Sequence, residues 1–177
     1  MSENALSRIQ AVSRVLRALA LAGLIGLAAL AGLAIVKTGW MITLLTVNGP
    51  ENVTITGMVT FATVVVFLLV LLPPAYTLFQ IRRLFTLFAE GRIFDPEPAG
   101  AIRRTGLGLL VMVVSGIIAK TVFVLLLTMH NPPGQRQLSI SVSSDAYVLA
   151  LFGGLMITLG WVLGEAARLS DENRQFV

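Results

Sequence analysis

Long apolar runs alternate with short polar intervals along this chain. Four runs of about 20 apolar residues are present, at residues 15–36, 57–80, 105–129 and 147–164. A helix needs ~20 such residues to cross the ~30 Å hydrocarbon core of a bilayer. The first run is too long for a secretory signal. The pattern therefore predicts an all-α membrane protein, a single integral-membrane domain over residues 1–177 with four transmembrane helices.

Two polar intervals combine a turn signal with alternating residues. Asn-Gly-Pro at residues 48–50 precedes the β-branched segment 52–56, and Asn-Pro-Pro-Gly at residues 131–134 precedes apolar positions 138, 140 and 142. Alternation of period two after a turn favours a strand. We expect a short outer β-strand in each interval.

The two halves of the chain resemble each other. Each has a span, a turn, an expected strand and a second span, and these are followed by EGRIF at residues 90–94 and ENRQF at residues 172–176. Asn can replace Gly at a left-handed helix cap. The sequence therefore predicts a duplicated helix–strand–helix hairpin, with Gly91 and Asn173 in equivalent turns.

The longest charged interval between apolar runs is residues 81–104. Its first half places apolar residues at helical spacing: Ile81, Leu84, Phe85 and Phe88. Gly91 suits the left-handed end of a helix, and Asp95-Pro96 suits the start of the next one. We expect two helical pieces with a bend at residues 91–94.

The distribution of charged residues predicts how the chain is oriented in the membrane. Hydrophobic residues make up 56% of the chain and charged residues only 12%, which excludes an ordinary soluble domain. Basic residues precede the first span, fill residues 81–104 and follow the fourth span. Because such residues stay cytoplasmic, both termini and this interval are expected in the cytosol. The net charge of +4 then indicates lipid contact rather than direct nucleic-acid binding.

The cytosolic interval is the candidate surface for a partner. Its members are Arg82, Arg83, Phe85, Phe88, Gly91, Phe94, Arg103 and Arg104. Topology and anionic lipid explain the arginines, but neither requires the phenylalanines. An apolar stripe beside a bend can lie on lipid, pack on the tail through Phe176, or receive a partner helix. We expect tail packing with a partner surface built on it.

Lys120 is a candidate intramembrane polar site. It lies about eight residues, or ~12 Å, inside the outer end of span three. An ionisable group at such a depth is a functional hypothesis. The alternative, which we favour, is that Lys120 reaches the outer headgroups or pairs with Asp145 or Glu51.

Small residues and prolines predict how the spans pack. Small side chains share one face of span one (Ala18, Ala22, Gly26 and Ala29) and one face of span four (Gly153, Gly160 and Gly164). Such faces favour close packing within a four-helix bundle, and the alternative is a seam in a homo-oligomer. Pro73 and Pro74 are expected to kink span two.

Residues for catalysis or metal binding are scarce. The chain has no cysteine, which excludes a thiol redox site. It has one histidine, His130, so a metal site could take its other ligands only from carboxylates. No glycine loop that could hold a phosphate follows a strand, and no nucleophile has a credible histidine partner. We therefore expect no catalytic residue, no cofactor, no metal ion and no enzymatic activity.

The bend also carries a resemblance to a known family. EGRIF at residues 90–94, followed by Arg103-Arg104-x-Gly106, resembles the central loop of the domain-of-unknown-function 2975 family, and the end of the chain resembles that family's usual ending. The resemblance extends over essentially the whole chain and implies a four-span protein of the bacterial inner membrane.

The resemblance also implies a role. Members are commonly encoded beside a small helix-turn-helix regulator, which implies a regulatory or accessory membrane partner of such a cytosolic protein. The alternatives are a small transporter or channel component and an immunity-type membrane protein.

Overall fold

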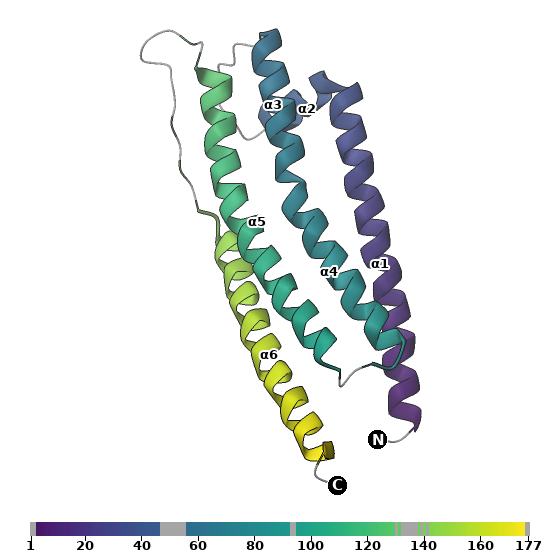
Figure 1. Cartoon of the computed structure of the whole chain (residues 1–177). Helices are drawn as coiled ribbons and strands as arrows, with labels where there is room; N and C mark the ends of the chain where they lie inside the picture. Colours follow the sequence, from purple (N-terminus) through teal and green to yellow (C-terminus); the bar gives the residue numbers. More distant parts are fainter. Residues whose placement is uncertain are drawn as a thin grey trace.

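Helices account for most of the chain that the structure describes. The computed structural model describes residues 3–46, 56–92, 95–129, 131, 138, 140 and 142–175. Its helices are α1 (Glu3–Val36), α2 (Thr38–Thr46), α3 (Gly57–Val70), α4 (Leu72–Ala89), α5 (Pro96–Thr128) and α6 (Ser144–Gln175). Figure 1 shows the long helices lying roughly along one direction, with α2 at the upper end.

Four helical stretches are long and apolar enough to cross a membrane. They are Ser7–Val36, Gly57–Ala89, Pro96–Thr128 and Ser144–Ser170. Large apolar side chains on their surfaces are exposed, for example Ile25 at 63% and Phe61 at 72%. A soluble protein hides such rows, whereas a bilayer covers them. The predicted all-α architecture with four spans is confirmed.

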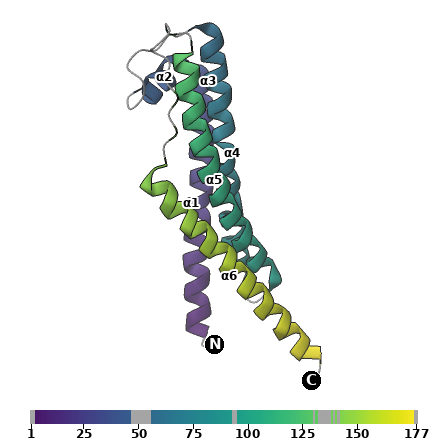
Figure 2. The same ribbon diagram turned by 90° about the vertical axis from the view of Figure 1, so that its left-hand side faces the viewer.

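The spans pack in an open row. α1 packs on α4, α4 packs on α5 and α5 packs on α6, while α6 has no other extensive neighbour among the described helices. Figures 1 and 2 show α1 and α6 at the two edges of this row. The four-helix bundle expected from the sequence is therefore an open row in the structure. Lipid or another chain can satisfy the apolar surface that closure would otherwise bury.

The second span contains a break, as its proline pair predicts. α3 and α4 meet at Leu71, and Pro73 and Pro74 lie in the first turn of α4. Prolines supply no N–H to the preceding carbonyls, so the helix cannot continue regularly through them. The Leu71 N–H bonds the Leu68 carbonyl at 3.2 Å, which tightens this turn.

In the connections between α2 and α3 and between α5 and α6, the described residues do not form the expected strands. Thr56 caps α3 instead, and its Oγ1 accepts a hydrogen bond from the Val59 N–H at 3.4 Å. The side chains of Leu138, Ile140 and Val142 are exposed, and none of these three residues belongs to a strand. Alternation sets the face of each side chain, but a strand also needs a neighbouring strand for its backbone. The other positions of both predicted strands lie outside the described residues.

Part of the connection between the first two spans is also helical. Residues 38–46 form α2, in which Met41 is fully buried and Ile42 is nearly so. These side chains pack with Ala34 of α1 and with Val64 and Phe67 of α3. α2 thus packs its apolar face against the ends of the first two spans that it connects.

Gly91 and Asn173 do not occupy equivalent turns. Gly91 ends α4 with φ of 78°, whereas Asn173 lies within α6, which continues to Gln175. Residues 174–177, RQFV, include neither glycine nor proline, so these four positions hold no strong helix terminator. This prediction is wrong, and a duplication is not visible in the described residues.

Glycines set the short distance between α5 and α6. A Cβ added to Gly160 would lie 2.9 Å from the Ala99 carbonyl oxygen, and one added to Gly153 would lie 3.0 Å from that of Gly106. Any side chain at these positions would separate the two backbones. The close packing predicted for span four is confirmed.

The small-residue face of α1 lies outside the row. Ala18, Ala22, Gly26 and Ala29 are all exposed, and Gly26 has no neighbour within 4 Å of an added Cβ. α1 instead approaches α4 through Gly23, beside Leu78. The prediction that this face packs within the molecule is therefore wrong. The orientation of α1 about its own axis turns these small residues away from the neighbouring helices.

Candidate functional site

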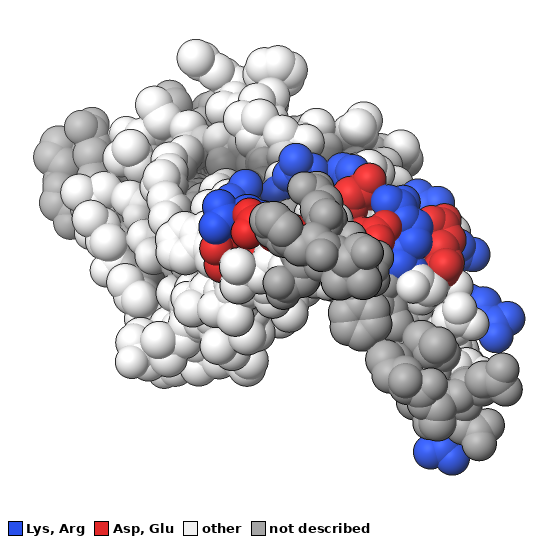
Figure 3. All heavy atoms as spheres, turned by 60° about the horizontal axis from the view of Figure 1, so that its bottom comes forward, with Lys and Arg blue, Asp and Glu red and all other residues white. Residues whose placement is uncertain are grey.

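Four helix ends lie toward the same end of the molecule. They are the N-terminal ends of α1 and α5 and the C-terminal ends of α4 and α6, although α6 extends away from α1 there (Figures 1 and 2). Basic side chains gather there, interspersed with acidic ones (Figure 3). We call this the arginine-rich end, defined by Arg82, Arg83, Arg92, Arg103 and Arg104.

The last turns of α4 form one side of the arginine-rich end. Arg83 is exposed and Arg82 is half-buried. Both line a cavity of about 290 Å³ together with Phe79, Thr86, Leu87 and Glu90. The cavity therefore combines two guanidinium groups and a carboxylate with apolar walls.

The turn after α4 has a defined left-handed cap. The Gly91 N–H bonds the Phe88 carbonyl at 3.1 Å, and the Arg92 N–H bonds the Leu87 carbonyl at 3.0 Å. This crossed pair of bonds, with Gly91 at positive φ, satisfies carbonyls that the helix end leaves free. The predicted glycine cap is confirmed.

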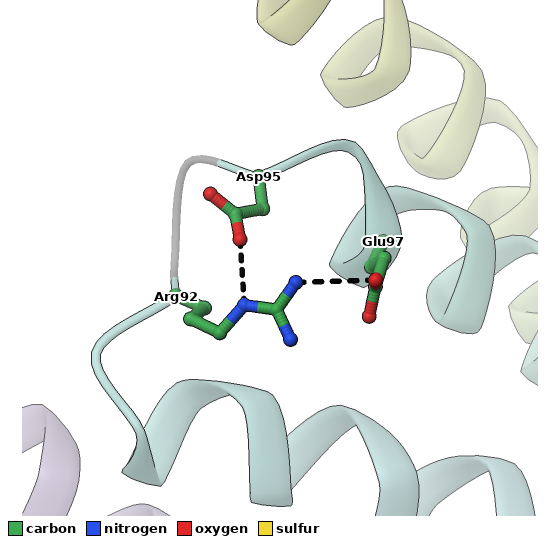
Figure 4. Close-up of polar contacts among 3 residues, drawn as sticks. All are labelled: Arg92, Asp95 and Glu97. Atoms are coloured by element: carbon green, nitrogen blue, oxygen red, sulfur yellow. Dashed lines mark hydrogen bonds and ion pairs between the residues drawn. The ribbon is translucent and has the colours of Figure 1, made fainter.

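Arg92 joins the end of α4 to the start of α5. Its Nε lies 2.7 Å from Oδ2 of Asp95, and its Nη2 lies 3.1 Å from Oε1 of Glu97 (Figure 4). The hydrogen bonds to Asp95 and then to Glu97 raise the pKa of Arg92 above its ordinary value. Asp95 makes no side-chain cap bond to α5, because its carboxylate faces Arg92 instead.

Two phenylalanines of α4 pack on each other. Phe85 and Phe88 are half-buried, with ring centroids 6.4 Å apart and planes at 72°, an edge-to-face contact. Phe94 and Phe176 lie outside the described residues. The described part of α6 packs on α5 rather than extensively on α4, so it gives no support to the expected packing between these rings and the tail.

The first turns of α5 form the other side of the arginine-rich end. Arg103 and Arg104 are exposed, whereas the adjacent Ile102 and Thr105 are buried. The backbone of Arg103 lies against Gly160 of α6. α6 therefore fixes this part of α5 while both arginine side chains remain accessible.

Lys120 lies far along α5 from these residues. It is exposed, and it lines a cavity of about 250 Å³ with Asp145 of α6. Neither side chain forms an ion pair with another described residue. The expected pairing with Asp145 is thus absent, and Glu51 lies outside the described residues.

Two features of the candidate sites escaped the sequence interpretation. One is the pair of contacts made by Arg92. The signal in the sequence was two acidic residues, Asp95 and Glu97, three and five positions later. The other is the cavity at Lys120, for which the signal was that the fourth apolar run is shorter than the third. Among the described residues, no three His, Cys, Asp or Glu side chains gather as metal ligands would.

Comparison with known proteins matches this chain to a family. A family model described as "Protein of unknown function (DUF2975)" matches residues 62–176. The match begins within α3 and includes α4, α5 and α6, so it covers less than the whole chain expected from the sequence. No curated protein and no solved structure matches this chain.

Proposed function

We propose that this chain, which belongs to the DUF2975 family of proteins of unknown function, is a non-enzymatic membrane protein that holds or regulates a cytosolic partner. The arginine-rich end is the proposed binding surface. The observation that carries the proposal is a set of accessible guanidinium groups mounted on either side of a fixed turn.

The availability of the arginines supports this proposal. Arg83, Arg103 and Arg104 are exposed, and none forms an ion pair with another described residue. A guanidinium presents several donors in a planar fork that matches a carboxylate or a phosphate. Arg92, by contrast, already bonds Asp95 and Glu97. Arg92 therefore stabilises the turn, while the other three remain free for a partner.

The cavity on α4 indicates the chemistry of that partner. Arg82 and Arg83 lie beside apolar Phe79 and Leu87 in its wall. A helix carrying acidic residues along an apolar face would contact both kinds of wall. We propose such a segment of a cytosolic regulator, of which a helix-turn-helix transcription regulator is the example that the family resemblance implies.

The proposed location is the bacterial inner membrane, with both termini in the cytosol. The distribution of basic residues supports this orientation, since they gather at the end where α1 begins and α6 ends. Held at the membrane, a regulator would be kept from its operator without any direct contact between this protein and nucleic acid.

A photo-crosslinking residue in place of Arg83 tests the proposal in cells. We expect crosslinks to one cytosolic protein with a DNA-binding domain. The same residue in place of Leu151, which is 58% exposed on the apolar surface of α6, should give none.

A charge-matched pair of variants adds specificity to this test. Arg104→Gln removes a guanidinium that forms no ion pair with another described residue, while Arg168→Gln removes one already bonded to Glu165 at 2.7 Å. Only Arg104→Gln should weaken the crosslink. Equal crosslinking in both variants, or crosslinks to lipid alone, would show that the arginines serve topology rather than a partner.

A further inference from the structure

The first turn of α6 lies deep along α5. α6 begins beside the middle of α5 rather than at its upper end (Figures 1 and 2). Asp145 shares a cavity with Lys120, yet α5 continues for eight more residues to Thr128. That length is about 12 Å at 1.5 Å per residue. The start of α6 therefore lies beside a part of α5 that continues for about two more apolar turns, residues 121–128.

Glycine contacts explain this displacement. Gly153 packs on Gly106, and Gly164 still approaches Ala99 near the start of α5. With this register, α6 extends past the start of α5 at the arginine-rich end and stops short at the opposite end. The result is a recess beside α5 that the described part of α6 does not fill.

The recess has both charged and apolar walls. Its cavity of about 250 Å³ is lined by Lys120, Asp145 and Ser143, and by apolar side chains that include Val113, Ile117 and Leu149. Lys120 and Asp145 are exposed and form no ion pair with another described residue. A charge beside apolar side chains in a membrane-spanning segment is unfavourable unless a partner neutralises it.

We propose that this recess binds the headgroup of a phospholipid that carries a phosphate and a primary ammonium, such as phosphatidylethanolamine. Lys120 would donate to the phosphate, and Asp145 would accept from the ammonium. The acyl chains would lie along the exposed apolar surface of α6, which includes Leu151 and Leu155. One ligand then satisfies both charges at once.

The same chemistry predicts selectivity among lipids. A choline headgroup has no N–H to donate to Asp145, and a glycerol headgroup has no positive charge. Both retain the phosphate that Lys120 recognises. The preference for ethanolamine over choline is therefore assigned to Asp145, and phosphate binding itself to Lys120. This inference concerns the end opposite the arginine-rich end and does not depend on the proposed cytosolic partner.

Native mass spectrometry of the detergent-purified full chain tests the inference. Phosphatidylethanolamine, phosphatidylcholine and phosphatidylglycerol are added separately, and bound lipid is counted per protein. We expect one retained phosphatidylethanolamine. Lys120→Met should weaken its apparent binding roughly tenfold, as expected for the loss of one charge-assisted contact.

Two further variants keep the test informative. Asp145→Asn, a change of nearly the same shape at an exposed position, should abolish the preference for ethanolamine over choline while phosphate binding persists. Lys37→Met removes another exposed lysine, in the connection between α1 and α2, and should change nothing. Equal lipid retention in all variants would overturn the proposal. So would displacement of the lipid by an equal concentration of free O-phosphoethanolamine, which would assign the recess to a soluble ligand.

Discussion

Gly106 of α5 and Gly153 of α6 bring their backbones into direct contact. A Cβ added to Gly106 would lie 2.5 Å from the Gly153 carbonyl oxygen and 2.9 Å from the backbone nitrogen of Ile157. A real side-chain atom cannot occupy that position without movement of one helix. This contact fixes the register of α6 along α5, and that register places Asp145 beside Lys120.

Gly106→Ala is therefore expected to destabilise the protein by about 1–3 kcal/mol, the usual cost of an overpacked site. The atoms in the way belong to backbone, which yields less easily than a flexible side chain. Thermal unfolding in detergent measures the effect. Gly154→Ala is the control, because nothing lies within 4 Å of its added Cβ. Equal stability of the two variants would contradict the close contact.

Gly91→Ala is expected to destabilise the turn between α4 and α5 by roughly 1–2 kcal/mol, since an L side chain is strained at positive φ. Gly91→Asn should cost less, because Asn tolerates the left-handed region better. Gly100→Ala, at an unobstructed helical position of α5, should not destabilise. The order of the three melting temperatures checks the prediction, and an unaffected Gly91→Ala would exclude the left-handed cap.

Arg92→Gln is expected to lower the melting temperature slightly, since its ion pairs are partly exposed, with side-chain exposure of 42% for Arg92 and 44% for Asp95. The pKa of Arg92 is raised by its bonds to Asp95 and Glu97. A raised pKa means that the stabilisation is fully present below the ordinary arginine value and is lost only as pH rises beyond it. The difference from the unmodified protein should thus be the same in neutral and mildly alkaline buffer.

Added salt should reduce this difference, because exposed ion pairs are screened. Adding Asp95→Asn to Arg92→Gln should cost less than the two single effects together, since both changes remove the same bond. A decline of the Arg92 effect on passing from neutral to mildly alkaline buffer would contradict the raised pKa.

Labelling of single cysteines tests the orientation. The chain has no native cysteine, so each introduced thiol gives an unambiguous signal. Lys37→Cys, between α1 and α2, should react with an impermeant reagent applied outside intact cells. Glu90→Cys, at the opposite end, should react only after permeabilisation. Glu90 is preferable to Gly91, whose positive φ would strain the cysteine. The reverse pattern would place the arginine-rich end outside.

Phe88→Ala tests whether the aromatic pair supports partner binding. Phe88 packs edge-to-face on Phe85, so its loss should loosen the end of α4 beside Arg83 and reduce the crosslink to the partner. Phe94→Ala is expected to act in the same direction. Lys120→Met should leave the crosslink unchanged, because Lys120 lies on α5 well away from the arginine-rich end. If Lys120→Met abolishes the cellular phenotype while Phe88→Ala is silent, the transport alternative replaces the proposed function.

Several elements followed directly from local sequence. The apolar runs predicted four spans, since the thickness of a bilayer sets the length of a crossing helix. Gly91 and Asp95-Pro96 marked the end of α4 and the start of α5, because caps depend on the conformations that a few residues can adopt. The break before Pro73 followed from the absence of a backbone donor.

The expectations that failed concerned partners distant in the chain. Strands were expected from alternation, but Thr56 finds its partner in the first turn of α3. Small residues marked faces on both α1 and α6, but sequence alone could not distinguish the buried Gly153 from the exposed Gly26. Either face is suited to close approach, and only the rotation of each helix decides which one meets a neighbour.

By itself, the sequence determined that this chain has four membrane-spanning segments. It also located the turn between the second and third spans. Hydrophobic length, glycine conformation and proline chemistry act within a few residues, so they can be recognised locally. Tertiary structure alone decided that the spans form an open row and that α6 is displaced along α5. It thereby placed Asp145 beside Lys120, because the register of two helices depends on contacts between residues that lie far apart in the chain.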